Sequence, residues 1–114
     1  MRTSFNMSDE NITMVSGDTL SFNVIVKDKN GDPVTVSGAT FKAKANIDAA
    51  AADISKSLGN GITQSDGVLT VRLAPADTAN LQGFFLYDMD ISVNSDRWTL
   101  LRGMLLIEVD VKGT

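Results

Sequence analysis

The sequence has no cysteine and no histidine among its 114 residues. The missing cysteines exclude a disulfide scaffold and thiolate metal sites, and the missing histidines exclude any mechanism that uses imidazole as base or ligand. The sequence also has fewer basic than acidic residues, ten compared with fourteen. The closest basic cluster, Lys27 and Lys29, is interrupted by Asp28. Because nucleic-acid binding requires concentrated positive charge, we expect no nucleic-acid partner.

Long hydrophobic runs are absent as well. No window approaches the run of about 18 apolar residues that a membrane helix needs, and the first residues, MRTSFNMSDENITM, lack the apolar stretch of a signal peptide. We therefore expect no membrane partner and no export signal at the N-terminus. Hydrophobic residues make up 43% of the chain and charged residues 21%, which is typical of a globular domain with its own core.

What the sequence does contain is alternation of apolar and polar residues in short runs, separated by glycine, asparagine and aspartate. This period of two predicts β-strands with one buried face. The predicted inward residues are Leu20, Phe22, Val24 and Val26; Ala39, Phe41, Ala43 and Ala45; Leu69, Val71 and Leu73; Phe85, Tyr87, Met89, Ile91 and Val93; and Leu101, Leu105, Ile107, Val109 and Val111. The small alanine side chains predict that bulky residues face them.

Three segments do not alternate. Residues 47–58 are rich in alanine and are predicted to form a loop with one or two helical turns. PADTANLQG predicts a single helical turn, with Pro75 near its first position and Gly83 after its end. Residues 1–11 are polar and unpatterned, and we expect an N-terminal arm outside the folded domain. Residues 12–114 predict an all-β, immunoglobulin-like antiparallel sandwich of about seven strands, without the cysteine pair of antibody domains.

Four segments share their order and spacing with a known group of proteins. They are SGDTLSFNVIVKDKNGDPVTVSGAT, SDGVLTVRLAPADTANL, GFFLYDMDISV and WTLLRGMLLIEVDV, and they extend from about Met14 to Val111. Together they resemble small proteins and modules of tailed bacteriophages, including the immunoglobulin-like N-terminal domain of phage baseplate upper proteins. The sequence departs from that pattern at TVSGAT and at EVDVKGT. The resemblance implies a structural module of the virion, assembled in the host cytoplasm.

Asp88 and Asp90 are candidates for chemistry, because residues two apart on a strand share a face. Paired carboxylates act as acid and base in glycoside hydrolysis, and they also bind calcium. Nothing in the sequence builds a cleft around them, so we favour a solvated outer face. DKNGD, residues 28–32, has no distal glutamate at calcium-loop spacing and predicts a turn. We predict no enzymatic activity, no metal and no cofactor.

The most informative residues are apolar ones that the alternation places on outer faces. They are Phe84, Leu86, Leu100, Met104 and Leu106. If their two strands are neighbours, these side chains form one apolar patch, and a lone monomer avoids such a patch beyond a few hundred Å². Either residues 47–58 or the N-terminal arm cover it, or another subunit does.

Trp98 is the one tryptophan of the chain and follows a predicted tight turn at residues 94–96. Three interpretations are open for it, in order of preference: closing one end of the core, anchoring an interface, or stacking on a sugar. We therefore predict a non-enzymatic structural protein of a tailed-phage virion, either a head decoration or cement protein or a tail or baseplate component. Its partners would be major capsid, tail or baseplate subunits, or further copies of itself. The alternative is a carbohydrate-binding or host-surface adhesion module.

Overall fold

Most of the chain is extended in the computed structural model, which describes residues 8–110. The elements are β1 (Ser8–Asp9), β2 (Ile12–Val15), β3 (Leu20–Ile25), β4 (Gly38–Lys44), β5 (Ile54–Leu58), β6 (Gly61–Ser65), β7 (Val68–Leu73), α1 (Pro75–Thr78), β8 (Gly83–Val93) and β9 (Asp96–Glu108). Residues 1–7 of the predicted arm and Val111 lie outside the described residues.

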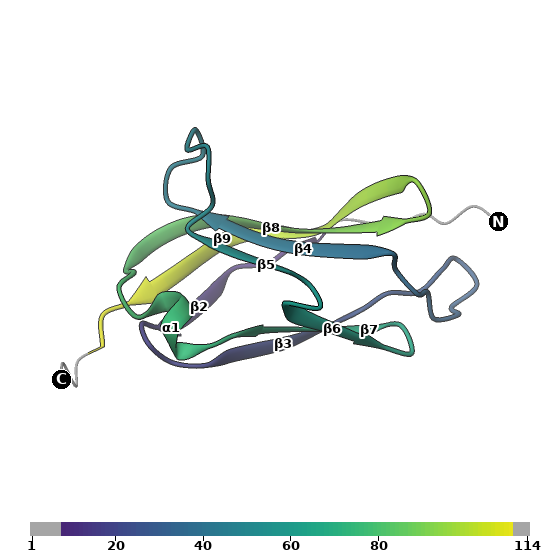
Figure 1. Cartoon of the computed structure of the whole chain (residues 1–114), viewed down its shortest axis with the longest axis horizontal. Helices are drawn as coiled ribbons and strands as arrows, with labels where there is room; N and C mark the ends of the chain where they lie inside the picture. Colours follow the sequence, from purple (N-terminus) through teal and green to yellow (C-terminus); the bar gives the residue numbers. More distant parts are fainter. Residues whose placement is uncertain (1–7, 111–114) are drawn as a thin grey trace.

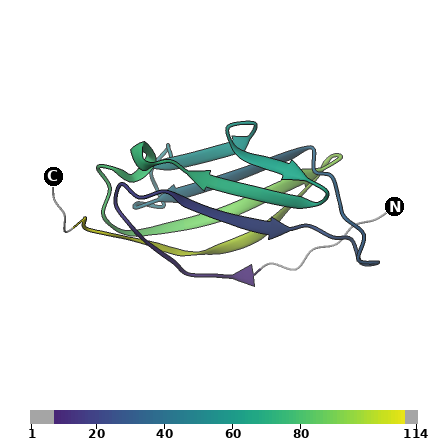
Figure 2. The ribbon, with the colours of Figure 1, turned by 90° about the horizontal axis from the view of Figure 1, so that it is seen from below.

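The strands form two packed layers (Figures 1 and 2). One layer has the order β5–β4–β8–β9, with β1 and β2 along the far edge of β9, and the other has the order β6–β7–β3. β5 links the layers, because it pairs antiparallel with β4 and, over two residues, parallel with β6. β1 and β2 both run parallel to β9. This strand order confirms the predicted immunoglobulin-like sandwich.

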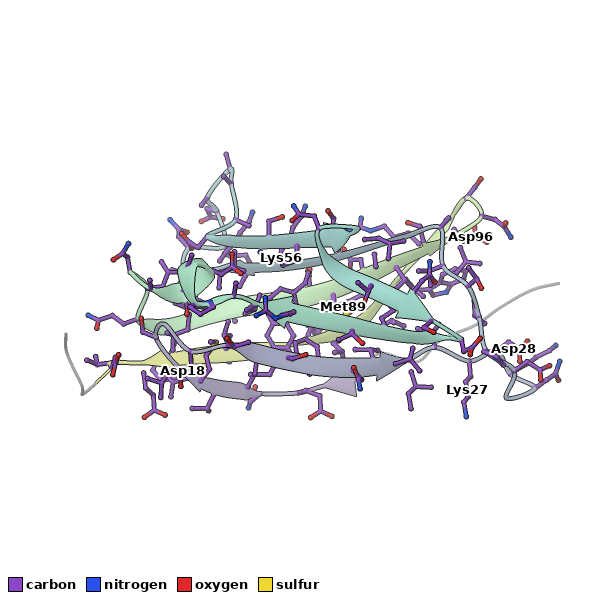
Figure 3. All side chains as sticks on the ribbon, turned by 60° about the horizontal axis from the view of Figure 1, so that its bottom comes forward. Asp18, Lys27, Asp28, Lys56, Met89 and Asp96 are labelled. Carbon is purple, nitrogen blue, oxygen red and sulfur yellow. The ribbon has the colours of Figure 1, made fainter. Side chains whose placement is uncertain are left out.

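The core lies between the layers and contains most of the predicted inward residues. The side chains with no exposed surface include Phe41, Val71, Leu73, Met89 and Leu105. Figure 3 labels Met89 among the side chains that fill the middle of the molecule. Bulky residues lie across from the small alanines, as expected: Ile91 is the register partner of Ala39, and Tyr87 that of Ala43.

The turns follow the residue types that the sequence supplies. Asp66 and Gly67 have φ values of 50° and 77° and join β6 to β7 as a two-residue hairpin, which is the conformation that Asp-Gly favours. In DKNGD, the Asp28 carboxylate accepts hydrogen bonds from the backbone N–H groups of Asn30 and Asp32, at 2.9 and 3.0 Å. This segment is therefore a turn, as predicted, stabilised by its own aspartate.

Several segment predictions are wrong. Ile54–Leu58 is strand β5 rather than part of a loop, because its alternating pattern completes the free edge of β4. Residues 8–11 lie along β9 at the edge of the sheet instead of outside the domain. Ala45 and Val109 are exposed, since β4 ends at Lys44 and β9 ends at Glu108.

A salt bridge connects the single-turn helix to β5. The Lys56 ammonium lies 2.8 Å from Asp77 Oδ1, while Asp77 Oδ2 accepts a hydrogen bond of 2.7 Å from the Ala74 backbone N–H. Partial burial raises the pKa of Asp77, but the hydrogen bonds from Lys56 and Ala74, with the positive charges of Lys56 and Arg72, outweigh it. The net result is a pKa below the ordinary value of 3.8.

Because this pKa is lower in the folded state than in the unfolded chain, ionised Asp77 stabilises the fold above about pH 4, and this contribution is lost as the pH falls through the folded pKa. We expect Asp77→Asn to lower the free energy of unfolding at neutral pH and to have a smaller effect near pH 3. Urea denaturation at both pH values measures the difference. The exposed Asp18, labelled with Lys56 in Figure 3, gives the control variant Asp18→Asn. A cost for Asp77→Asn that stays constant with pH would contradict the ionic origin.

Candidate functional site

The candidate site is the outer face of β4, β8 and β9, which points away from the second layer. The register sets its side chains in cross-strand rows: Phe84 with Leu106; Leu86 with Met104 and Lys44; Asp88 with Arg102 and Lys42; and Asp90 with Thr99 and Thr40. The first two rows contain the apolar strip, defined as Phe84, Leu86, Met104 and Leu106. The rows that follow are polar and charged. The alternation therefore brings four of the predicted patch residues together.

In the described part of the chain, neither residues 47–58 nor residues 8–11 of the predicted arm cover the apolar strip. Phe84 is 63% exposed, Leu86 47% and Met104 39%, while Leu106 is half-buried. Residues 8–15 lie beside β9 in the plane of the sheet rather than over its face. Within residues 8–110 the strip is therefore open to solvent.

The expected outward orientation of Leu100 is wrong. Asp90 pairs with Thr99 while Met89 pairs with Leu101, so Leu100 is an extra residue in β9 at a β-bulge. The bulge resets the alternation and turns the Leu100 side chain into the core, where it is 7% exposed. The adjacent leucines Leu100 and Leu101 are the sequence feature that could have indicated the bulge, since both side chains pack toward the interior.

Trp98 also lies away from the outer face. Its register partner is Ile91, an inward residue, and Trp98 is half-buried against the core cluster. This position agrees with the interpretation in which Trp98 closes one end of the core.

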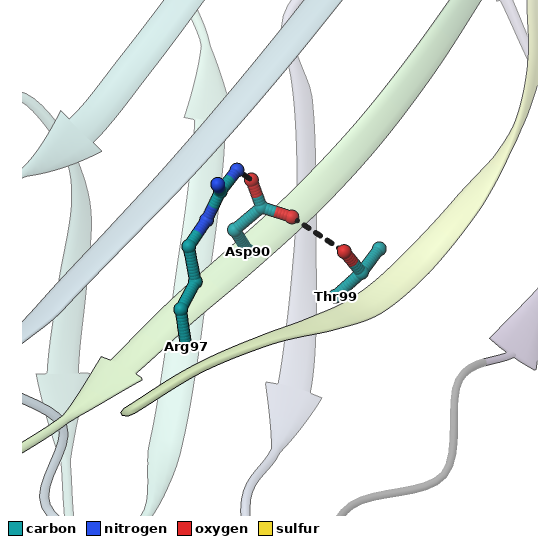
Figure 4. A network of polar contacts seen from close by, with 3 residues as sticks. All are labelled: Asp90, Arg97 and Thr99. Carbon is teal, nitrogen blue, oxygen red and sulfur yellow. Dashed lines mark hydrogen bonds and ion pairs between the residues drawn. The ribbon is translucent and has the colours of Figure 1, made fainter. Parts of the chain in front are cut away.

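Asp90 is not the solvated carboxylate that the sequence predicted. It is 7% exposed and forms a salt bridge with Arg97, and the Thr99 hydroxyl donates a hydrogen bond of 2.9 Å to Asp90 Oδ1 (Figure 4). The hydrogen bond and the charge of Asp90 raise the pKa of Arg97. Both oxygens of Asp90 are thus occupied by groups of the same face, which suits a structural role rather than proton transfer.

Asp88 lies one row away and is exposed, as predicted. Partial burial of its carboxyl, followed by repulsion from Asp90, raises the pKa of Asp88, and the positive charges of Arg97, Lys42 and Arg102 only partly offset this. The two carboxylates lie along one strand, and both line a groove on the outer face without facing each other across it. In residues 8–110, no group of three or more acidic, histidine or cysteine side chains is arranged to hold a metal ion.

A loop that was not predicted to belong to the site borders this face. Residues 45–53 are fixed to β4 by Lys44 Nζ, which donates to the Ala49 carbonyl at 2.8 Å, and by Asp53, whose carboxylate accepts from the Ala45 N–H at 2.8 Å. Figure 1 shows this loop standing away from the sheet. It carries Ile47, which is 68% exposed and lines a groove of about 680 Å³ together with Leu86 and Met104. The other side chains of this groove are mostly charged, and they include Lys42, Asp88, Asp90 and Arg102. Ile47 thus extends the apolar surface beyond the strip.

Comparison with known proteins adds little to these observations. No protein-family profile and no curated protein match the chain. Among solved structures, the chain is similar to the extracellular domains of the voltage-gated sodium channel beta4 subunit, described as parallel homodimers with a role in cell-cell adhesion. The TM-score is 0.48 at 13% identity, over 97% of this chain and 99% of that one. No helix within residues 8–110 has the length and hydrophobicity to cross a membrane.

Proposed function

We propose that this protein is a non-enzymatic structural component of a tailed-phage virion, which binds other virion proteins through the apolar strip. It serves as a head decoration or cement protein, or as a tail or baseplate module, and it is assembled in the host cytoplasm. The motifs between Met14 and Val111 support the phage assignment. The observation that carries the proposal is the two outward cross-strand pairs, Phe84 with Leu106 and Leu86 with Met104, in which all but the half-buried Leu106 are exposed.

The strip is large enough to contribute to the free energy of association. Fully burying one exposed large apolar side chain contributes about 1.5–3 kcal/mol, and because these four are already partly buried, completing their burial supplies a few kcal/mol toward the cost of association. Among the surrounding charged residues, Asp90 is already paired with Arg97. A carbohydrate-binding function would instead need a platform of exposed aromatic rings, and on the described face Phe84 is the one such ring.

Two variants test this proposal in particles of the phage that encodes the chain. We expect Phe84→Asp and Leu106→Asp to fold, because both side chains point outward, and to be lost from the virion, because a carboxylate cannot be buried without a partner. Mass spectrometry of purified particles measures incorporation, and thermal unfolding of the isolated variants checks the fold.

The control is Ile25→Asp, which changes an equally exposed residue on β3, in the other layer. It should fold and be incorporated like the wild type. Absence of the wild-type protein from particles would overturn the phage assignment. Normal incorporation of folded Phe84→Asp would overturn the role of the apolar strip.

A further inference from the structure

The outer side chains of β9 have a self-complementary order. Along the strand they read Arg102, Met104, Leu106 and Glu108, which is base, apolar, apolar, acid. A second β9 laid over the first in the opposite direction would place each apolar residue against an apolar residue and each charge against its opposite. β8 has the same apolar centre, since Leu86 and Phe84 are the register partners of Met104 and Leu106.

We propose that the occupant of the apolar strip is a second copy of this chain, bound face to face through a two-fold axis perpendicular to the strands. The axis passes between the Phe84–Leu106 row and the Leu86–Met104 row. Leu106 then packs against Met104 of the second copy, and Phe84 against its Leu86. This inference rests on the proposed function in taking the strip as a contact surface, and it names the partner.

Charge selects this orientation over the other simple two-fold arrangement. In the antiparallel dimer, Arg102 of each copy faces Glu108 of the other, and the symmetry makes this contact twice. An axis along β8 would instead place Lys42 of one copy against Arg102 of the other, and Asp88 against Asp88. Like charges facing each other at an interface oppose association, so the antiparallel dimer is favoured.

The loop of residues 45–53 fits the same arrangement. It leaves β4 at the apolar end of the face, where the two-fold axis also brings Lys42 and Lys44 of the second copy. The exposed side chain of Asp48 supplies negative charge there, and exposed Ile47 adds apolar surface. In this arrangement the loop lies against the second copy and forms part of the contact.

Charge reversal at the two ends of the strip tests both the partner and its orientation. In a dimer of Arg102→Glu, two acidic side chains face each other at each end of the strip, and in a dimer of Glu108→Arg two basic side chains do. Each variant alone should therefore dimerise at least about tenfold more weakly than the wild type. An equimolar mixture of the two should recover wild-type affinity as a heterodimer, because both contacts then join opposite charges. Sedimentation velocity over a concentration series of the full chain measures all four samples.

Circular dichroism and thermal unfolding establish that each variant is folded. If either reversal impairs folding, Arg102→Gln and Glu108→Gln remove one charge each and should weaken the dimer by a smaller factor. A wild-type chain that stays monomeric at high concentration overturns the inference, and so does a mixture that associates no better than its components.

These outcomes are separable from those of the virion experiment. A monomeric protein that still needs Phe84 for incorporation would overturn the dimer and leave the proposed function standing. A dimer with the expected charge pairing that is absent from purified particles would overturn the proposed function and leave the dimer standing.

Discussion

Replacing Gly103 with alanine is expected to lower the free energy of unfolding by about 3 kcal/mol, at the upper end of the usual cost of overpacking. A Cβ atom at this position would lie 2.0 Å from the carbonyl oxygen of Glu10 and 2.8 Å from its carbonyl carbon. Both are backbone atoms, so no side-chain rotation relieves the overlap. Either β9 or the segment between β1 and β2 has to move.

The Glu10 backbone is held firmly against Gly103. Its N–H donates to the Arg102 carbonyl at 2.9 Å, and its carbonyl accepts a hydrogen bond of 2.7 Å from the Tyr87 hydroxyl. The next residue, Asn11, accepts from the Met104 N–H through its side chain at 3.1 Å. Tyr87 is also the register partner of Gly103. We therefore expect the alanine variant to release residues 8–15 from β9.

Gly38→Ala is the matched control. Gly38 also lies within a strand, but its Cβ would be 3.7 Å from the nearest atom, the Cβ of Ser92, which is ordinary contact. Urea denaturation should therefore show a large loss for Gly103→Ala and little change for Gly38→Ala. Amide hydrogen exchange should show faster exchange over residues 8–15 in the first variant alone. Equal stability of the two variants would mean that the N-terminal strands are not packed against Gly103 in solution.

The sequence predicted the fold because alternation with a period of two continues through four of the longer strands. In β8, for example, Phe85, Tyr87, Met89 and Ile91 are all buried as expected. The pattern fails where one extra residue, Leu100, forms a bulge and reverses the two faces of β9. This bulge could not be predicted, because the alternation within one strand does not show how that strand pairs with its neighbour. The apolar strip was still found, since Met104 and Leu106 follow the bulge.

Local propensity misled where tertiary pairing decided the structure. The alanines before Ile54 favour a helix, but Ile54–Leu58 pairs with the edge of β4. The turn at 94–96 was predicted, but the salt bridge from Arg97 to Asp90 was not, because it depends on the register of β9 along β8. Ile47 was missed for a similar reason: its place beside the strip comes from the path of a loop.

Replacing Phe41 with alanine is expected to lower the free energy of unfolding by about 3–5 kcal/mol, the usual cost of removing a fully buried phenylalanine. Phe41 has no exposed surface and lies on β4 between the layers. Its ring stacks on that of Tyr87, with centroids 5.4 Å apart, and meets the ring of Phe22 edge-on at 6.0 Å. Alanine would leave a cavity and remove both ring contacts.

The same change at Phe84 separates folding from binding. Phe84 is 63% exposed, so Phe84→Ala should change the stability of the monomer by less than about 0.5 kcal/mol. If the strip is a contact surface, this variant should nevertheless associate more weakly, whereas folded Phe41→Ala should keep its affinity. Urea denaturation and sedimentation on the same preparations measure both quantities. A Phe84→Ala variant that loses stability but not association would place that ring in the core and remove the basis for the contact surface.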